Sequence, residues 1–183
     1  MRHLGRLLVV ISLVAGGGFA IFKFLLLPYI QQGQSTSSSG TSAFYAATFP
    51  DANNTPQAIR QWQGKIIVVN FWATWCPPCL EEMPELSKFH NEYKDRNVMV
   101  LGISTDDVAK IAEFAKTTSV SYPLLAADMQ AMGLAESLGN NRSILPYTVV
   151  IKPDGSIAKT HLGRINHAIL QQTLLPLLAT KQP

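Results

Sequence analysis

Cysteine and histidine are scarce in this chain of 183 residues, which contains two cysteines and four histidines. A structural zinc site needs four ligands, and its cysteines usually come in two pairs. Here Cys76 and Cys79 form the only pair, and the histidines, at positions 3, 90, 161 and 167, do not have the spacing of a zinc finger. We therefore predict no metal site, and we expect no cofactor.

Charged residues are also few, at 15% of the chain, and the positive excess is confined to the N-terminus. Arg2, Arg6 and Lys23 supply three positive charges before residue 31, and the remainder contains 12 Lys or Arg against 12 Asp or Glu. A nucleic-acid-binding domain presents a clustered basic face. The even balance beyond residue 31 gives no such face, and we predict no nucleic-acid partner.

The N-terminal segment is apolar, with one charge between residues 7 and 27. As a helix, these 21 residues would reach ~31 Å, which matches the ~30 Å hydrocarbon core of a membrane. Arg2 and Arg6 favour a cytoplasmic N-terminus. We predict a cytoplasmic segment over 1–6 and a single transmembrane anchor over 7–30 in a bacterial inner membrane, which places the rest of the chain on the periplasmic or outer face.

A cleaved signal peptide is the alternative, because Gly18-Phe19-Ala20 roughly fits a cleavage site. The apolar character that continues to residue 30 favours the anchor. The next residues, QQGQSTSSSGTS, have no charge and no periodicity, and we expect a flexible linker over 31–43. A globular composition follows, which predicts one domain over 44–183.

The hydrophobic pattern of this domain alternates between strands and helices, so we predict an α/β fold. Strands separated by helices form a parallel core through crossovers, and a late hairpin with a Pro-Asp-Gly turn adds antiparallel strands, giving a mixed central sheet flanked by helices. The expected elements are strands over 65–72 and 98–104, helices over 76–95, 105–118 and 128–139, the hairpin over 147–163, and a closing helix over 165–178.

Cys76 falls where a buried strand ends and a helix begins. The helix dipole favours an anion at this end, so the Cys76 thiol should ionise readily and attack disulfides. Cys79 lies one turn further on and could resolve the mixed disulfide. An inert structural disulfide is the alternative, but so short a loop gains little stability from one.

Longer motifs around the cysteines carry a family resemblance. The stretch VVNFWATWCPPC, the later Glu82 and Pro84, and LPYTVVIKPDG resemble the membrane-anchored TlpA/ResA-like thiol:disulfide oxidoreductases of the thioredoxin superfamily over most of 44–178. The resemblance implies a thioredoxin-like fold and a dithiol that reduces disulfides of exported proteins, often apocytochrome c. It also implies a transmembrane electron donor of the DsbD or CcdA kind.

The resemblance assigns the nucleophile to Cys76, the resolving cysteine to Cys79, and a nearby acid to Glu82. Glu82 has an independent claim, because residues three apart on a helix are neighbours and a partly buried carboxylate could take the Cys79 proton. The alternative is a solvated surface acid, as expected for Glu81 and Glu85.

The predicted client-binding residues come from the two motifs, the one that contains the dithiol and LPYTVVIKPDG. Pro146 matches the cis-proline that faces the dithiol in this superfamily, and Tyr147 follows it where the family more often has a small residue, which bears on the shape of the groove. Asn70 stands where thioredoxins carry a buried acid. Trp72 could shield the site, although core packing is the simpler interpretation. The client-binding set is Trp75, Pro77, Pro78, Leu145, Pro146 and Tyr147.

Pro77 and Pro78 have no N–H group to donate to a thiolate, and Cys79 supplies the first one. We therefore expect the Cys76 thiolate to be less stabilised than in a motif with N–H groups at these two positions, and the potential to be lower, of the reductase type. Two other functions stay open, namely a thiol peroxidase of the AhpC/TSA-like branch and a non-catalytic thioredoxin-fold binding module.

Overall fold

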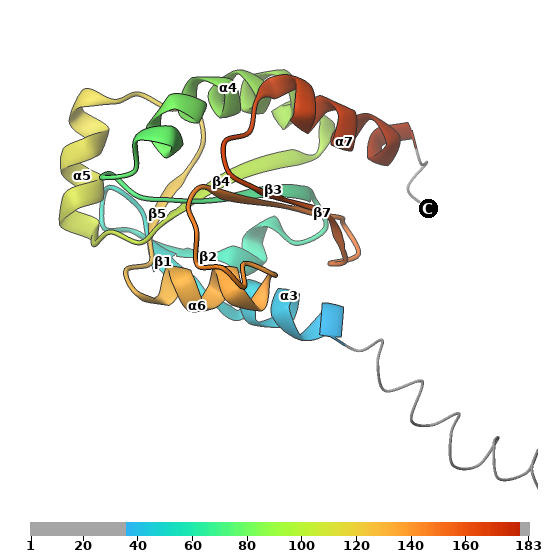
Figure 1. Ribbon diagram of the computed structural model, residues 1–183, viewed down its shortest axis with the longest axis horizontal. Coiled ribbons are helices and arrows are strands. Elements are labelled where there is room, and N and C mark those ends of the chain that lie inside the picture. Colours follow the sequence, from blue (N-terminus) through green and yellow to red (C-terminus); the bar gives the residue numbers. More distant parts are fainter. Residues whose placement is uncertain (1–35, 180–183) are drawn as a thin grey trace, which may run out of the picture. The chain divides into compact units, whose positions relative to one another are not determined.

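The computed structural model describes residues 36–179 of the chain (Figure 1). The predicted cytoplasmic segment 1–6 and membrane anchor 7–30 lie outside this range. Within it, none of the helices combines the length and the apolar character that a membrane span requires.

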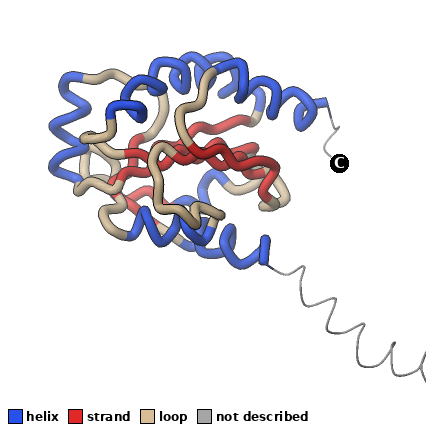
Figure 2. Tube along the Cα trace, viewed as in Figure 1, coloured by secondary structure: helices blue, strands red, loops and turns tan. Residues whose placement is uncertain are grey.

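The strands lie between the helices at the centre of the domain (Figure 2). They form a five-stranded mixed sheet in the order β5-β4-β3-β6-β7. Strand β3 pairs in parallel with β4, which pairs in parallel with β5, whereas β6 and β7 are antiparallel to their neighbours. This arrangement confirms the predicted parallel core with a late hairpin. The bounds are β3 Ile66–Trp72, β4 Val98–Ser104, β5 Leu124–Ala126, β6 Tyr147–Ile151 and β7 Ile157–Leu162.

Helices cover both faces of the sheet (Figure 1). Helices α4 (Pro77–Tyr93), α5 (Val108–Thr117) and α7 (His167–Ala179) contribute to the apolar cluster on one face. Helices α3 (Thr36–Ala46) and α6 (Gln130–Ser137) contribute to the cluster on the other. The remaining elements are a small hairpin of β1 (Thr48–Pro50) and β2 (Pro56–Ala58), and the 3-10 turns η3 (Ile59–Trp62) and η4 (Lys94–Arg96).

Strand β3 is buried along its whole length and supplies side chains to both clusters. Successive residues of a strand point to opposite faces. Val68 and Trp72 therefore pack with Cys79 on the side of α4, and Val69 and Phe71 pack on the side of α3 and α6. This alternation decides which side chains can reach the dithiol.

The segment 31–43, predicted to be a flexible linker, is helical in its second part, because α3 begins at Thr36 and continues to Ala46. The predicted start of the domain at residue 44 therefore falls inside this helix. The physical reason is tertiary, since Phe44 and Tyr45 are buried against the sheet and hold the end of a helix whose Ser- and Gly-rich sequence has little helical preference. The short strand β5 and the β1–β2 hairpin were also missed.

Candidate active site

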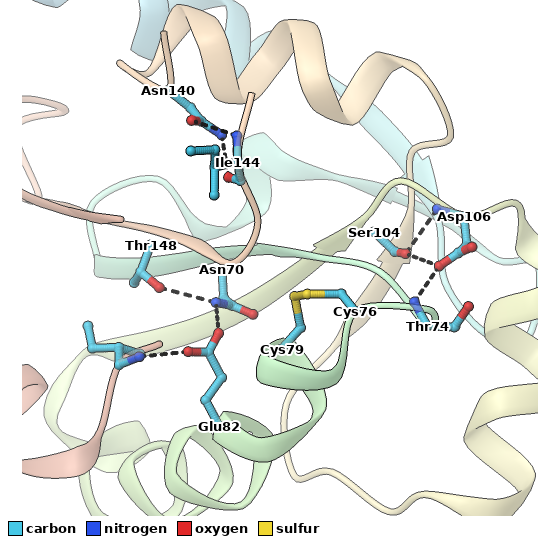
Figure 3. The surroundings of a disulfide bond; sticks show 11 residues. Asn70, Thr74, Cys76, Cys79, Glu82, Ser104, Asp106, Asn140, Ile144 and Thr148 are labelled. Carbon is cyan, nitrogen blue, oxygen red and sulfur yellow. Dashed lines mark hydrogen bonds between the residues drawn. A yellow bond between two sulfur atoms is a disulfide. The ribbon is translucent and has the colours of Figure 1, made fainter. Parts of the chain in front are cut away.

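Cys76 and Cys79 form a disulfide at the start of α4, with an S–S distance of 2.06 Å (Figure 3). Strand β3 ends at Trp72, and Cys76 occupies the N-cap of the helix in an extended conformation. Cys76 is 4% exposed and Cys79 is fully buried. Of the two cysteines, only Cys76 keeps any exposed surface.

The backbone around Cys76 offers few donors to its sulfur. Pro77 and Pro78 occupy the first helical positions and have no N–H group. The next two N–H groups, those of Cys79 and Leu80, donate to the carbonyl oxygen of Cys76 at 3.0 and 3.2 Å. These amides are thus engaged by the backbone carbonyl.

A buried acid holds the loop between β3 and the dithiol. The carboxylate of Asp106 accepts hydrogen bonds from the Thr74 N–H at 2.7 Å and from the Ser104 hydroxyl at 3.0 Å (Figure 3). Sequence reasoning missed Asp106, because it was assigned to the start of the helix over 105–118. Nothing in the local pattern distinguishes it from Asp107, which does cap α5 by accepting from the Lys110 N–H.

Glu82 lies on the turn of α4 that follows Cys79, and its side chain is fully buried. One carboxylate oxygen accepts from the Asn70 side-chain amide at 2.6 Å, and the other accepts from the Ile165 N–H at 2.7 Å. Burial raises the pKa of Glu82 from 4.5 to about 7, although both hydrogen bonds and the charge of Arg164 act to lower it. Glu82 is therefore not a solvated surface acid, and it can exchange a proton near neutral pH.

Neighbouring acids differ from Glu82 in their surroundings. Glu81 is exposed and pairs with Arg164. Glu85 is half-buried and accepts a hydrogen bond from the His167 N–H. Within residues 36–179, no group of three His, Cys, Asp or Glu side chains is arranged as metal ligands would be.

The side chain of Asn70 contacts the Glu82 carboxylate from the sheet. It is fully buried on β3, paired in register with Thr148 on β6, and its amide nitrogen also donates to the Thr148 hydroxyl at 3.1 Å. The amide thus connects the carboxylate of Glu82 to the central strands (Figure 3).

The second motif places Pro146 directly before Tyr147, the first residue of β6. The Leu145–Pro146 peptide bond is cis, as the resemblance implied. Asn140 holds the preceding loop, since its side-chain amide donates to the Ile144 carbonyl at 2.9 Å. Leu145 is half-buried against both apolar clusters, and Pro146 is buried.

Trp75, Pro77 and Pro78 are exposed next to the dithiol, with Trp75 69% exposed. They are available to a client. Trp72 is fully buried, with its ring 5.0 Å from that of Phe114, which confirms its interpretation as a core residue.

Tyr147 requires a correction. Its side chain is 3% exposed and lies in the apolar cluster on the face away from α4, where its hydroxyl donates to the Leu138 carbonyl at 2.9 Å. The cause is strand alternation, since Thr148 is the residue that points towards Glu82 and Asn70. The side chain of Tyr147 therefore does not shape a groove beside the dithiol.

The mixed sheet and the dithiol at the N-terminus of α4 define a thioredoxin-like domain. More specifically, residues 42–160 match the model of the AhpC/TSA family, and the chain belongs to that family. A thiol:disulfide interchange protein of the thioredoxin family from Chlorobium tepidum has the same fold, with a TM-score of 0.64 and 23% identity over 73% of this chain and 93% of that chain.

Sequence relatives confirm the resemblance to ResA-like proteins. The chain is similar to the thiol-disulfide oxidoreductase ResA of Bacillus subtilis, with 26% identity over 165 residues, 88% of this chain and 86% of that protein. It is also similar to ResA of Halalkalibacterium halodurans, with 28% identity over 115 residues. That match covers 62% of this chain and 63% of the relative.

Proposed function

We propose that the protein is a thiol:disulfide oxidoreductase that reduces disulfides of exported proteins through Cys76 and Cys79. The observation that supports it most is the combination of a nearly buried dithiol at a helix N-terminus with a buried carboxylate, Glu82, on the following turn. A disulfide that only braced the fold would need no proton acceptor beside it.

The reaction proceeds in two exchanges. The Cys76 thiolate attacks one sulfur of the client disulfide, forms a mixed disulfide and releases the other client sulfur as a thiolate. Cys79 then loses its proton to Glu82 and attacks the Cys76 sulfur. The Cys76–Cys79 disulfide forms, and the second client sulfur leaves as a thiolate. The two client thiolates take up protons from Glu82 and from water, so the client leaves as a dithiol that has gained two electrons and two protons.

The reducing direction is supported by the backbone around Cys76. A dithiol with a stabilised thiolate is a strong oxidant, because its reduced form is favoured. Pro77 and Pro78 contribute no N–H donor, and the N–H groups of Cys79 and Leu80 donate to a carbonyl oxygen instead. With little stabilisation of the Cys76 thiolate, the oxidised form is favoured and the pair gives up electrons readily.

The apolar stretch over 7–30 supports a location at the membrane, with the domain on the periplasmic face of a bacterial inner membrane. Exported proteins with disulfides are the clients in this proposal, and apocytochrome c before haem attachment is the specific candidate. A transmembrane donor of the DsbD or CcdA kind would return the dithiol to its reduced form.

Two serine variants test the proposal in membranes of the producing bacterium. Cys76→Ser should abolish reduction of a disulfide-containing client, because no nucleophile is left. Cys79→Ser should accumulate mixed disulfides, because the first exchange occurs and the second does not. Mass spectrometry of the trapped species identifies the clients, and clients without a CXXCH segment would contradict the cytochrome assignment. Full client reduction by Cys76→Ser would contradict the whole proposal.

A thiol peroxidase is the second candidate, since the family match covers the AhpC/TSA domain. Hydrogen peroxide consumption by the reduced protein separates the two functions, because a reductase should consume peroxide no faster than a free dithiol does. A non-catalytic binding module would keep its activity in Cys76→Ser.

A further inference from the structure

Asn70 carries a polar atom that the rest of the site leaves without a partner. Its amide nitrogen donates to Glu82 and Thr148, but its amide oxygen is buried and accepts no hydrogen bond from any described residue. A buried acceptor without a donor destabilises the folded state, and such groups are rare in native proteins. We therefore looked for a hydrogen-bond donor that could reach this oxygen in the reduced protein.

The dithiol can supply such a partner when it is reduced. Asn70 is on the face of β3 that α4 covers, and Cys79 precedes Glu82 by one turn on that helix. The amide oxygen points towards the side of the disulfide (Figure 3). In the oxidised protein the Cys79 sulfur carries no hydrogen, whereas in the reduced protein its S–H is a donor.

We propose that Asn70 is a positioning residue whose amide couples the protonation of Cys79 to that of Glu82, an inference that rests on the reductase function proposed above. In one orientation the amide nitrogen donates to the Glu82 carboxylate and the amide oxygen accepts the Cys79 S–H. In the other, turned by half a rotation, the oxygen accepts an O–H from protonated Glu82 and the nitrogen donates to the Cys79 thiolate.

The two orientations are the states before and after proton transfer. The proton that leaves the Cys79 sulfur is taken up by the Glu82 carboxylate, and the electron pair left on sulfur attacks Cys76. The Thr148 hydroxyl fits both states, because a hydroxyl group can accept from the amide nitrogen or donate to the amide oxygen. An ionised aspartate at position 70 has no hydrogen to donate to the Cys79 thiolate. The side-chain amide of Asn70 can therefore do what a carboxylate at this position cannot.

The charged and titratable groups around Glu82 come from several elements. Arg164, in the segment between β7 and α7, lowers the pKa of Glu82, and the Tyr122 hydroxyl, before β5, interacts with the carboxylate electrostatically. Burial outweighs these effects and raises the pKa of Glu82 to about 7. The Glu82 carboxyl can therefore take up a proton near neutral pH.

The test is the titration of the Glu82 carboxyl in the full-length protein, followed by carbon-13 NMR in the oxidised and the reduced states. In the wild type, the Cys79 S–H holds the amide with its nitrogen towards Glu82. The pKa of Glu82 should therefore be lower in the reduced than in the oxidised protein, by roughly half to one unit for one hydrogen bond. Equal values in the two states would overturn the inference without any variant being needed.

Variants then assign the difference to Asn70. Asn70→Leu should raise the pKa of Glu82 in both states and remove the difference between them, because a side chain with no amide cannot transmit it. Thr148→Val is the matched control, which removes a hydrogen bond of the same amide but should keep the difference. If the pKa of Glu82 still differed between the oxidised and reduced states of Asn70→Leu, another group would cause the difference and the inference would be overturned.

These measurements need no client, so they are independent of turnover. If the coupling is present but the protein reduces no client, the proposed function fails. If client reduction is intact but the coupling is absent, only the role of Asn70 fails.

Discussion

Replacing Glu82 by glutamine is expected to change how the stability of the oxidised protein depends on pH. Glu82 is fully buried, and its pKa is about 7 in the folded protein against an ordinary value of 4.5. The folded state therefore binds the Glu82 proton more tightly than the unfolded state does. The stabilisation is fully present below about pH 4.5 and is lost as the pH rises through about 7.

The magnitude follows from the difference between the two pKa values. A shift from 4.5 to about 7 corresponds to about 3 kcal/mol of stability. About 2.5 kcal/mol of this is lost between pH 5 and pH 8. For a protein of this size, the loss corresponds to a decrease in Tm of roughly 5–10 °C.

The assay is urea unfolding of the oxidised full-length wild type and Glu82→Gln in the same detergent, at several pH values between 5 and 8. The glutamine keeps a similar shape but has no charge to desolvate, so its free energy of unfolding should lack this pH-dependent loss. His90, whose pKa is lowered by burial, contributes equally to both proteins and cancels in the comparison. Parallel curves for the two proteins would refute the assignment of a raised pKa to Glu82.

Three further predictions concern residues around the dithiol. Pro78→Ala should raise the reduction potential measured against glutathione, because the new N–H can donate to the Cys76 thiolate; an unchanged value would count against the role given to the prolines. Trp75→Ala should change stability by less than about 0.5 kcal/mol, since the side chain is exposed, but should raise the KM for a protein client. Tyr147→Phe should cost about 1 kcal/mol by removing the hydrogen bond to Leu138, and client reduction should be unchanged; a changed KM would restore Tyr147 to the client site.

The sheet and the dithiol could be predicted because their signals are local. The run from Ile66 to Trp72 is apolar and rich in β-branched residues, and Cys76 and the prolines follow it after a short loop. Hydrophobic periodicity and turn residues report on neighbours in the sequence, and these neighbours are enough to place a strand, a helix and the cysteines between them. Glu82 belongs to the same helix, so its position one turn after Cys79 could also be predicted.

The parts that were missed depend on distant contacts. The burial of Glu82 is completed by Asn70 on β3 and by the Ile165 N–H, 83 residues further along the chain. Asp106 holds the Thr74 N–H across 32 residues. Helix α3 depends on the packing of its last turns against the sheet, and neither spacing nor composition reports such contacts.

The reduction potential of the Cys76–Cys79 pair tests the account most directly. It can be measured by equilibrating the full-length protein with glutathione redox buffers and quantifying the oxidised fraction by thiol alkylation. A disulfide reductase with a weakly stabilised thiolate should have a potential near that of thioredoxin, about −270 mV. A value close to that of a strong oxidant, about −120 mV, would contradict both the role of the prolines and the proposed direction of electron flow.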